Sequence, residues 1–207
     1  PKWVKDPAPS DSYRSIFRWG DPNFVKYPKE SLYKMMKEVF SMTDDDFREY
    51  PVDIGWETVE LQQKPNIDEK HIKKFKEIVG DAYVSTADYN RLAVAYGSTA
   101  YDLLRMRERK IDSLPDVVVY PDTTEQVEQI VAYCTENDIP LYVYGGGSSV
   151  TRGVEPIKGG VSLDMRMRFN KVISFNEVDQ TITVQAGMSG QKLEETLNNA
   201  VQNFGAK

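Results

Sequence analysis

The clearest candidate for chemistry is the glycine-rich segment 145–153, whose sequence is GGGSSVTRG. Three glycines let the backbone turn sharply and present bare N–H groups. Successive N–H groups in such a turn form a concave anion site, to which Ser148, Ser149 and Thr151 add hydroxyl donors. This pattern predicts a phosphate or pyrophosphate ligand, and Arg152 lies close enough in sequence to pair with it. The alternative is a flexible surface loop, in which glycine runs are also common.

Two common nucleotide-binding motifs do not fit this segment. A P-loop requires a lysine at a fixed spacing after its glycines, and none stands there. The Rossmann fingerprint requires a glycine three residues after Gly147, where Val150 stands, and a helix that opens at the loop. Gly153 and Pro156 exclude that helix, so Asp164 lacks the context of a ribose-binding acid.

Other chemistry has few candidates in this sequence. Its single cysteine, Cys134, and single histidine, His71, exclude a disulfide within the chain and a histidine–cysteine zinc site. His71 lies in a lysine-rich segment, 70–76, which we interpret as the solvated face of a helix rather than a phosphate-binding patch. Cys134 is expected to be an inert packing residue. We assign no metal ligand and no catalytic acid, base or nucleophile to this chain.

The composition is that of a folded protein. Of the 207 residues, 40% are hydrophobic and 11% aromatic, which is enough for a packed core. The net charge of -6 argues against nucleic-acid binding, and no stretch approaches the roughly 20 apolar residues of a membrane span. The first eleven residues are polar and unlike a signal peptide. We therefore expect a soluble, cytoplasmic protein and leave a peroxisomal location open.

The glycine-rich segment follows a predicted β-α-β unit. Asp116–Tyr120 and Leu141–Tyr144 are predicted strands, and Thr124 is expected to cap a helix that ends near residue 137. Strands connected in this way lie parallel with a right-handed crossover. Ligands of such folds bind at the carboxyl ends of the strands, which favours a binding loop here. The apolar face of the helix is expected to carry Val127, Ile130, Val131 and Cys134.

The remaining predicted strands lie near residues 161–164, 171–175 and 181–186. Asn176–Gln180 is the expected hairpin loop between the last two. A final helix is predicted from Gly190 to about Phe204, and Gly205 directly after it indicates that the polypeptide continues.

The part before residue 114 is expected to consist mostly of helices and loops. Helical spacing of apolar residues predicts helices over Lys29–Met42, Glu69–Val79 and Tyr96–Arg109. The predicted fold is therefore α+β, with a mostly helical region over 1–113 and an α/β subdomain over 114–207. The basic residues at the end of the third helix suit either an anionic substrate or the helix dipole; they are Arg105, Arg107, Arg109 and Lys110.

An ordered series of motifs resembles a known family. Residues 115–121 (PDVVVYP), a helix with T-x-E-Q-V-x-x-I-V, and residues 140–150 (PLYVYGGGSSV) resemble the FAD-binding domain of the vanillyl-alcohol oxidase, or PCMH, type. The later stretches 162–165 and 183–187 are similar to it as well. The resemblance covers about residues 80–207. Its fold is expected to be the first subdomain of that FAD-binding domain.

Residues before this domain point to a narrower group. Arg91–Gly97 and Asp102–Arg107 resemble the segment that precedes the FAD domain in alkyldihydroxyacetonephosphate synthases and bacterial FAD-linked oxidases. Phe17–Gly20 is a weaker hint in the same direction.

The resemblance implies a noncovalent FAD, because Ser148 and Ser149 occupy the stretch where some relatives have a flavin-linked histidine. The glycine segment would wrap the pyrophosphate, Pro121 would lie beside the cofactor, and Ala186 with Gly187 would pass the adenine side. The implied FAD contacts are Pro121, Val143, Tyr144, Gly145, Gly146, Gly147, Ser148, Ser149, Val150, Ala186 and Gly187.

The family pattern continues with a second glycine-containing FAD segment and a cap domain, and this sequence contains neither. The expected partners are FAD, a small-molecule substrate, the remaining C-terminal polypeptide or cap domain, and a second copy in a homodimer, but no nucleic acid. The favoured function is an FAD-dependent oxidoreductase that oxidises a CH–OH substrate such as a 2-hydroxy acid. The alternatives are alkyldihydroxyacetonephosphate synthase, in which flavin assists an acyl-to-alkyl exchange, and a scaffold subunit without flavin.

Overall fold

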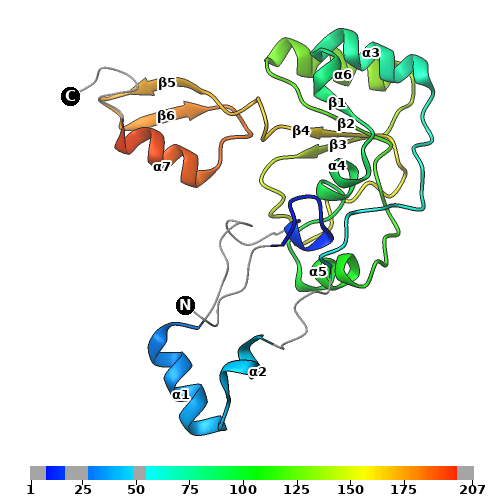
Figure 1. Ribbon diagram of the computed structural model, residues 1–207. Coiled ribbons are helices and arrows are strands. Elements are labelled where there is room, and N and C mark those ends of the chain that lie inside the picture. The colour runs from blue at the N-terminus through cyan, green and yellow to red at the C-terminus, as the bar shows by residue number, and fades with distance from the viewer. Residues whose placement is uncertain (1–7, 17–27, 49–54, 200–207) are drawn as a thin grey trace. The chain divides into compact units, whose positions relative to one another are not determined.

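The computed structural model describes residues 8–16, 28–48 and 55–199, and these fall into two compact units (Figure 1). The first unit contains residues 1–60 and 100–110, and the second contains residues 61–99 and 111–207. The predicted motif at Phe17–Gly20 and the predicted end of the last helix near Phe204 lie outside the described residues. The division of the sequence at residue 114 stays a prediction about domains.

The first unit is built from short helices. It contains the 3-10 turn η1 (Tyr13–Ser15) and the helices α1 (Glu30–Phe40), α2 (Asp44–Arg48) and α5 (Ala100–Arg107). Lys37 of α1 pairs with Asp44 of α2 at 2.7 Å. Helix α5 begins at Ala100, later than the sequence predicts, because the N–H of Ser98 donates to the carbonyl of Ser149 and not within a helix.

A four-stranded sheet organises the second unit. Its strands are β1 (Val84–Ser85), β2 (Val117–Val119), β3 (Leu141–Tyr144) and β4 (Val161–Asp164). The order is β1-β2-β4-β3, so β4 lies between the two strands of the predicted β-α-β unit. Strands β2 and β3 both run parallel to β4, as the sequence predicts for that unit, while β1 is antiparallel to β2.

Helices cover both faces of this sheet. On one face, α3 (Glu69–Val79) packs with α6 (Thr124–Glu136), and the core there includes Phe75, Ile130 and Leu163 (Figure 1). On the other face, α4 (Asp88–Ala93) contacts β2, beside a smaller cluster that contains Tyr120 and Tyr144. The short 3-10 turn Asp81–Tyr83, η2, links α3 to β1.

The structure corrects two details of α6. Thr123, not Thr124, is the N-cap, and its hydroxyl accepts the N–H of Gln126. Val131 is 43% exposed and does not belong to the core, whereas Cys134 is buried as predicted. Burial raises the pKa of Cys134 to about 11, so its thiol stays protonated and unreactive at neutral pH.

A two-stranded antiparallel sheet follows, formed by β5 (Val172–Asn176) and β6 (Thr181–Val184), with the predicted hairpin loop between them. Helix α7 (Gly190–Asn198) comes next, and the Ser189 hydroxyl caps it. In the described part of the chain, no helix is long and apolar enough to cross a membrane.

The buried carboxylate of Asp116 forms hydrogen bonds that link the start of β2 to other segments of the second unit. It accepts the N–H of Gly160, just before β4, at 2.6 Å and the N–H of Asn66 at 2.8 Å. The fully buried Arg91 of α4 donates from Nε to the carbonyl of Pro115 at 2.8 Å. Burial lowers the pKa of Arg91, while Asp88 and Asp116 oppose that change and help keep the guanidinium charged.

We expect Asp116→Ala to lower the free energy of unfolding by about 2–4 kcal/mol, because it leaves the buried N–H of Gly160 without its acceptor and removes a negative charge that favours the buried Arg91 cation. Urea unfolding of the purified protein measures the change. Glu128→Ala, at an exposed position of α6, is the matched control and should change stability by less than about 0.5 kcal/mol. Equal effects of the two substitutions would contradict the structural role of Asp116.

Candidate functional site

The glycine loop, residues 145–153, begins at the carboxyl end of β3, beside the end of β4, where Tyr144 pairs with Asp164. Its residues alternate in exposure. Gly145 and Ser149 are half-buried and Gly147 is buried, whereas the even-numbered residues between and after them are exposed. Those exposed residues are Gly146, Ser148 and Val150. The position is the one at which parallel α/β sheets bind ligands.

Two glycines of the loop differ in what an added side chain would meet. Gly147 has a left-handed φ of 65°, and a Cβ there would collide with the Tyr144 hydroxyl. At Gly146 a Cβ would meet no protein atom within 4 Å. The fold therefore demands glycine at 147, while at 146 the missing side chain leaves open space outside the loop.

Backbone donors face this open side. The N–H groups of Ser148 and Val150 donate to no acceptor within the described residues. On the inner side, the Ser98 hydroxyl donates to the carbonyl of Gly147 at 2.6 Å and the Ser98 N–H donates to the carbonyl of Ser149 at 2.8 Å. An outward-facing set of unpaired N–H groups is what a phosphate oxygen requires.

The structure also brings Ala186 to the loop. A Cβ on Gly145 would lie 3.7 Å from the carbonyl oxygen of Ala186. Gly187 donates its N–H to the carbonyl of Phe169 at 2.8 Å, and a Cβ on it would collide with the backbone of Met165. Glycine at 187 is thus required by the protein itself, whether or not a ligand lies beside it.

Pro121 is buried two residues after the end of β2, and contacts of the next residue, Asp122, hold this segment near Ala186. The carbonyl of Asp122 accepts a hydrogen bond from Gln185 Nε2 at 3.3 Å, and its carboxylate accepts one from Lys171 Nζ at 2.7 Å. These contacts fix the Pro121 segment to the residues that precede Ala186. Val143, by contrast, projects from β3 as an exposed side chain.

A charged and aromatic cluster lies at the carboxyl ends of the central strands. Arg166 donates to both carboxylate oxygens of Asp164, at 2.9 and 2.7 Å, and its guanidinium carbon lies 4.5 Å from the centre of the Tyr144 ring. The ion pair offsets the negative charge of Asp164 next to the loop. Burial, followed by the Asp164 carboxylate, raises the pKa of Tyr120 to about 12, so that phenol is neutral at physiological pH.

Arg152 pairs within the protein. Its guanidinium donates to both oxygens of the buried Glu155 carboxylate, from Nε at 2.5 Å and from the other nitrogen at 2.9 Å. Glu155 also accepts the hydroxyl of Ser113 at 3.0 Å. Arg152 therefore anchors the end of the glycine loop, a role that the sequence analysis did not consider.

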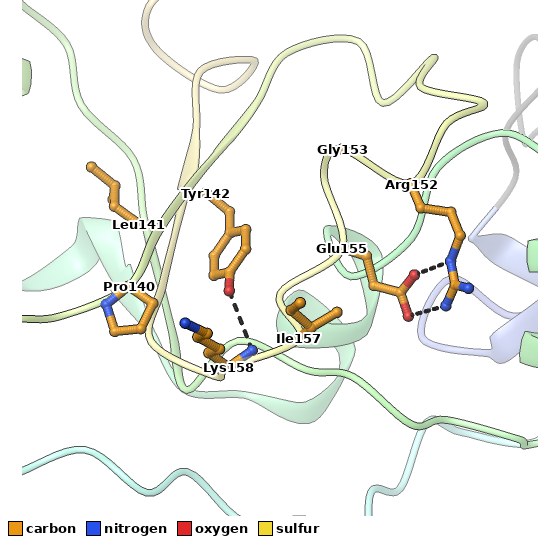
Figure 2. Close-up of a pocket in the computed structure, with 8 residues that line it drawn as sticks. All are labelled: Pro140, Leu141, Tyr142, Arg152, Gly153, Glu155, Ile157 and Lys158. Carbon is orange, nitrogen blue, oxygen red and sulfur yellow. Dashed lines mark hydrogen bonds and ion pairs between the residues drawn. The ribbon is translucent and has the colours of Figure 1, made fainter.

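Figure 2 shows the Arg152–Glu155 pair on one side of an open pocket of about 670 Å³ and the Tyr142 hydroxyl accepting the Lys158 N–H on the other. Because Leu141 and Tyr142 are the first residues of β3, this part of the pocket lining lies at the amino end of the strand. The remaining lining residues are Gly153 and Ile157.

Other residues that the sequence suggested as candidates for chemistry make contacts within the protein. His71 Nδ1 lies 2.9 Å from the Tyr133 hydroxyl, and neighbouring Lys73 is exposed. Of the basic residues at the end of α5, Arg105 is not on an exposed helix end: it is 4% exposed and pairs with buried Asp102 at 3.6 Å. Within residues 8–16, 28–48 and 55–199, no group of three histidine, cysteine or acidic residues is arranged to hold a metal ion.

Comparisons with known proteins agree with this geometry. Residues 115–206 match the family model described as "FAD binding domain". Alkyldihydroxyacetonephosphate synthase from Dictyostelium discoideum is 27% identical over 187 residues, which cover 86% of this chain and 30% of that protein. Mitochondrial D-lactate dehydrogenase [cytochrome] 1 from Saccharomyces cerevisiae is 26% identical over 139 residues, covering 66% of this chain and 23% of that protein.

The solved structure of an alkyldihydroxyacetonephosphate synthase superposes with a TM-score of 0.64 at 26% identity, over 69% of this chain and 27% of that chain. Residues 115–206 thus belong to the FAD-binding domain family, of the PCMH type, and FAD is the cofactor of that domain. The predicted α+β fold is confirmed. The chain spans about a third or less of the length of these relatives.

The residues of the glycine loop fit the pyrophosphate of FAD. The open space at Gly146 and the outward N–H groups of Ser148 and Val150 provide room and donors for an anion. Which residues contact FAD, including the eleven named from the sequence, stays a prediction.

Gly146→Val and Gly147→Ala distinguish a ligand requirement from a folding requirement. We expect Gly146→Val to leave the unfolding temperature of the apoprotein within about 2 °C, because its side chain points into open space, but to weaken FAD binding at least tenfold by filling that space. Gly147→Ala should lower the unfolding temperature, because it strains a left-handed residue against Tyr144.

Thermal unfolding and quenching of flavin fluorescence measure the two effects in the full-length protein. Unchanged FAD affinity in Gly146→Val would refute the placement of the pyrophosphate at this loop.

Proposed function

We propose that this chain is the FAD-binding part of a flavin-dependent oxidoreductase that oxidises a CH–OH substrate such as a 2-hydroxy acid, with FAD held noncovalently. The observation that carries the proposal is the glycine loop, whose open face and unpaired N–H groups lie within a segment of the FAD-binding domain family. Similarity to a D-lactate dehydrogenase supports the substrate class.

The residues of this chain hold and orient the cofactor, which when bound supplies a two-electron acceptor for the oxidation of the substrate. The N–H groups of Ser148 and Val150 bind phosphate oxygens, and Gly146 leaves room for them. Ser148 and Ser149 cannot form the covalent bond that a histidine forms in some relatives. We assign no catalytic acid or base to the residues of this chain, which spans 23% of that D-lactate dehydrogenase.

A second candidate function is alkyldihydroxyacetonephosphate synthase. The supporting observation is the extent of the similarity: the match to the Dictyostelium discoideum protein covers 86% of this chain and therefore includes residues outside 115–206. The FAD site proposed above is the same for both functions. They differ in the substrate, since the synthase acts on a phosphorylated compound that needs basic residues elsewhere in the polypeptide.

The visible spectrum of the full-length protein, recorded before and after acid precipitation, tests the cofactor. We expect a flavin spectrum that moves completely to the supernatant, because no residue of the glycine loop is a nucleophile that attaches to flavin in this family. Flavin that stays in the protein pellet would refute noncovalent binding. A colourless protein that FAD does not restore would refute the flavoenzyme proposal and favour the scaffold subunit.

Anaerobic mixing separates the two enzymatic functions. D-lactate and other small 2-hydroxy acids should bleach the visible flavin band of an oxidoreductase, because the flavin accepts two electrons from the substrate. Acyl-dihydroxyacetone phosphate with a long-chain alcohol should instead give an ether product without net flavin reduction. Formation of that product, with no bleaching by any hydroxy acid, would replace the first function by the second.

A further inference from the structure

Ser98 holds the glycine loop from its inner side by two hydrogen bonds to alternate carbonyls. Its hydroxyl donates to the Gly147 carbonyl at 2.6 Å, and its N–H donates to the Ser149 carbonyl at 2.8 Å. Ser98 comes from the segment between α4 and α5, and it belongs to the same unit as the loop. It is far from the loop in sequence, and no nucleotide-binding motif includes it.

These two bonds determine the direction of two peptide groups. The described peptides are all trans, and in a trans peptide the carbonyl of one residue and the N–H of the next point in opposite directions. With the carbonyls of Gly147 and Ser149 turned toward Ser98, the N–H groups of Ser148 and Val150 point away from it. Neither of these N–H groups has an acceptor within the described residues, and both Ser148 and Val150 are exposed.

A glycine-rich segment needs such a restraint. Glycine loses more conformational freedom on ordering than any other residue, so an untethered GGG loop would have to be ordered by the ligand itself. Restraints that exist before binding remove that entropic penalty from the affinity. The Tyr144 side chain restricts the loop at Gly147, where an added Cβ would collide with its hydroxyl.

We propose that Ser98 is a positioning residue for the cofactor: it pre-orients the Ser148 and Val150 N–H groups toward the phosphate oxygens of FAD. This inference rests on the proposed FAD site and adds a residue outside the 115–206 segment to it. Ser98 does not touch the phosphates; it acts through the two carbonyls.

Ser98→Ala and Ser98→Thr test the proposal in the full-length protein. The alanine variant loses the bond to the Gly147 carbonyl and keeps the backbone bond to Ser149. We expect its affinity for FAD, and for ADP as a competitor that shares the pyrophosphate, to fall about tenfold. Threonine keeps the hydroxyl, and both affinities should return to within about threefold of the wild type. Fluorescence quenching gives the dissociation constants.

Ser85→Ala is the matched control. The Ser85 hydroxyl accepts hydrogen bonds from Asn90 and Ala87 in the same unit, away from the glycine loop. It should lower the unfolding temperature about as much as Ser98→Ala without changing the affinity for FAD or ADP. Equal FAD affinity in Ser98→Ala and wild type would overturn the role of Ser98 while leaving the FAD site intact, whereas a wild type that does not bind FAD would overturn both.

Amide hydrogen exchange on the wild-type protein decides the question if Ser98→Ala does not fold. Bound ADP should protect the amides of Ser148 and Val150 from exchange, because those N–H groups donate to the pyrophosphate. Unchanged exchange at both amides under saturating ADP would overturn the proposal.

Discussion

Strand β4 occupies the place between β2 and β3, and this topology governs the rest of the second unit. The chain leaves β3 at its carboxyl end and must enter the neighbouring parallel strand at the amino end. Strands of four residues are only about 13 Å long, far less than residues 145–160 can span. The surplus chain is available to form the glycine loop at the carboxyl edge, where ligands of parallel sheets bind.

Fixed points along this connection give the loop a defined shape. In the connection 145–160, Gly147 packs against Tyr144 near the start. The Arg152–Glu155 pair is joined to Ser113 in the middle, and Asp116 accepts the N–H of Gly160 at the end. A linker that merely crosses the sheet needs none of these contacts. The glycine run is thus an ordered part of the fold. Its lack of side chains lets the backbone approach a neighbour closely and does not serve motion.

Local sequence signals predicted the elements well. The bounds of α3 match the prediction, because apolar periodicity, the Asp68 cap and Gly80 act within that segment. The hairpin of β5 and β6 is likewise encoded by its own residues. In α6 the sequence pattern predicted Thr124 as the cap, whereas the N–H of Gln126 donates to the hydroxyl of Thr123, one residue earlier. Val131 is exposed although its spacing places it with the apolar residues of α6, since periodicity alone does not indicate which of them the rest of the protein covers.

Features that depend on distant contacts escaped prediction. The position of β4 arises from strand pairing, and no sequence pattern within 161–164 states which neighbours it will have. Ser98 and Arg91 are ordinary polar residues until the fold brings them to Gly147 and Pro115. The glycine loop itself was found from sequence because glycine has a conformational meaning of its own, whereas the residues that restrain it do not.

The short strand β1 has a consequence for how this protein can be divided. It pairs with β2 on the side away from β4, so Val117–Val119 has neighbours on both sides. A fragment that began at residue 115, where the family match starts, would present this wholly apolar strand as an open edge. Such edges recruit strands from other chains and promote aggregation. The sheet of the second unit therefore begins upstream of the family match, and β1 covers the edge of β2 that such a fragment would expose.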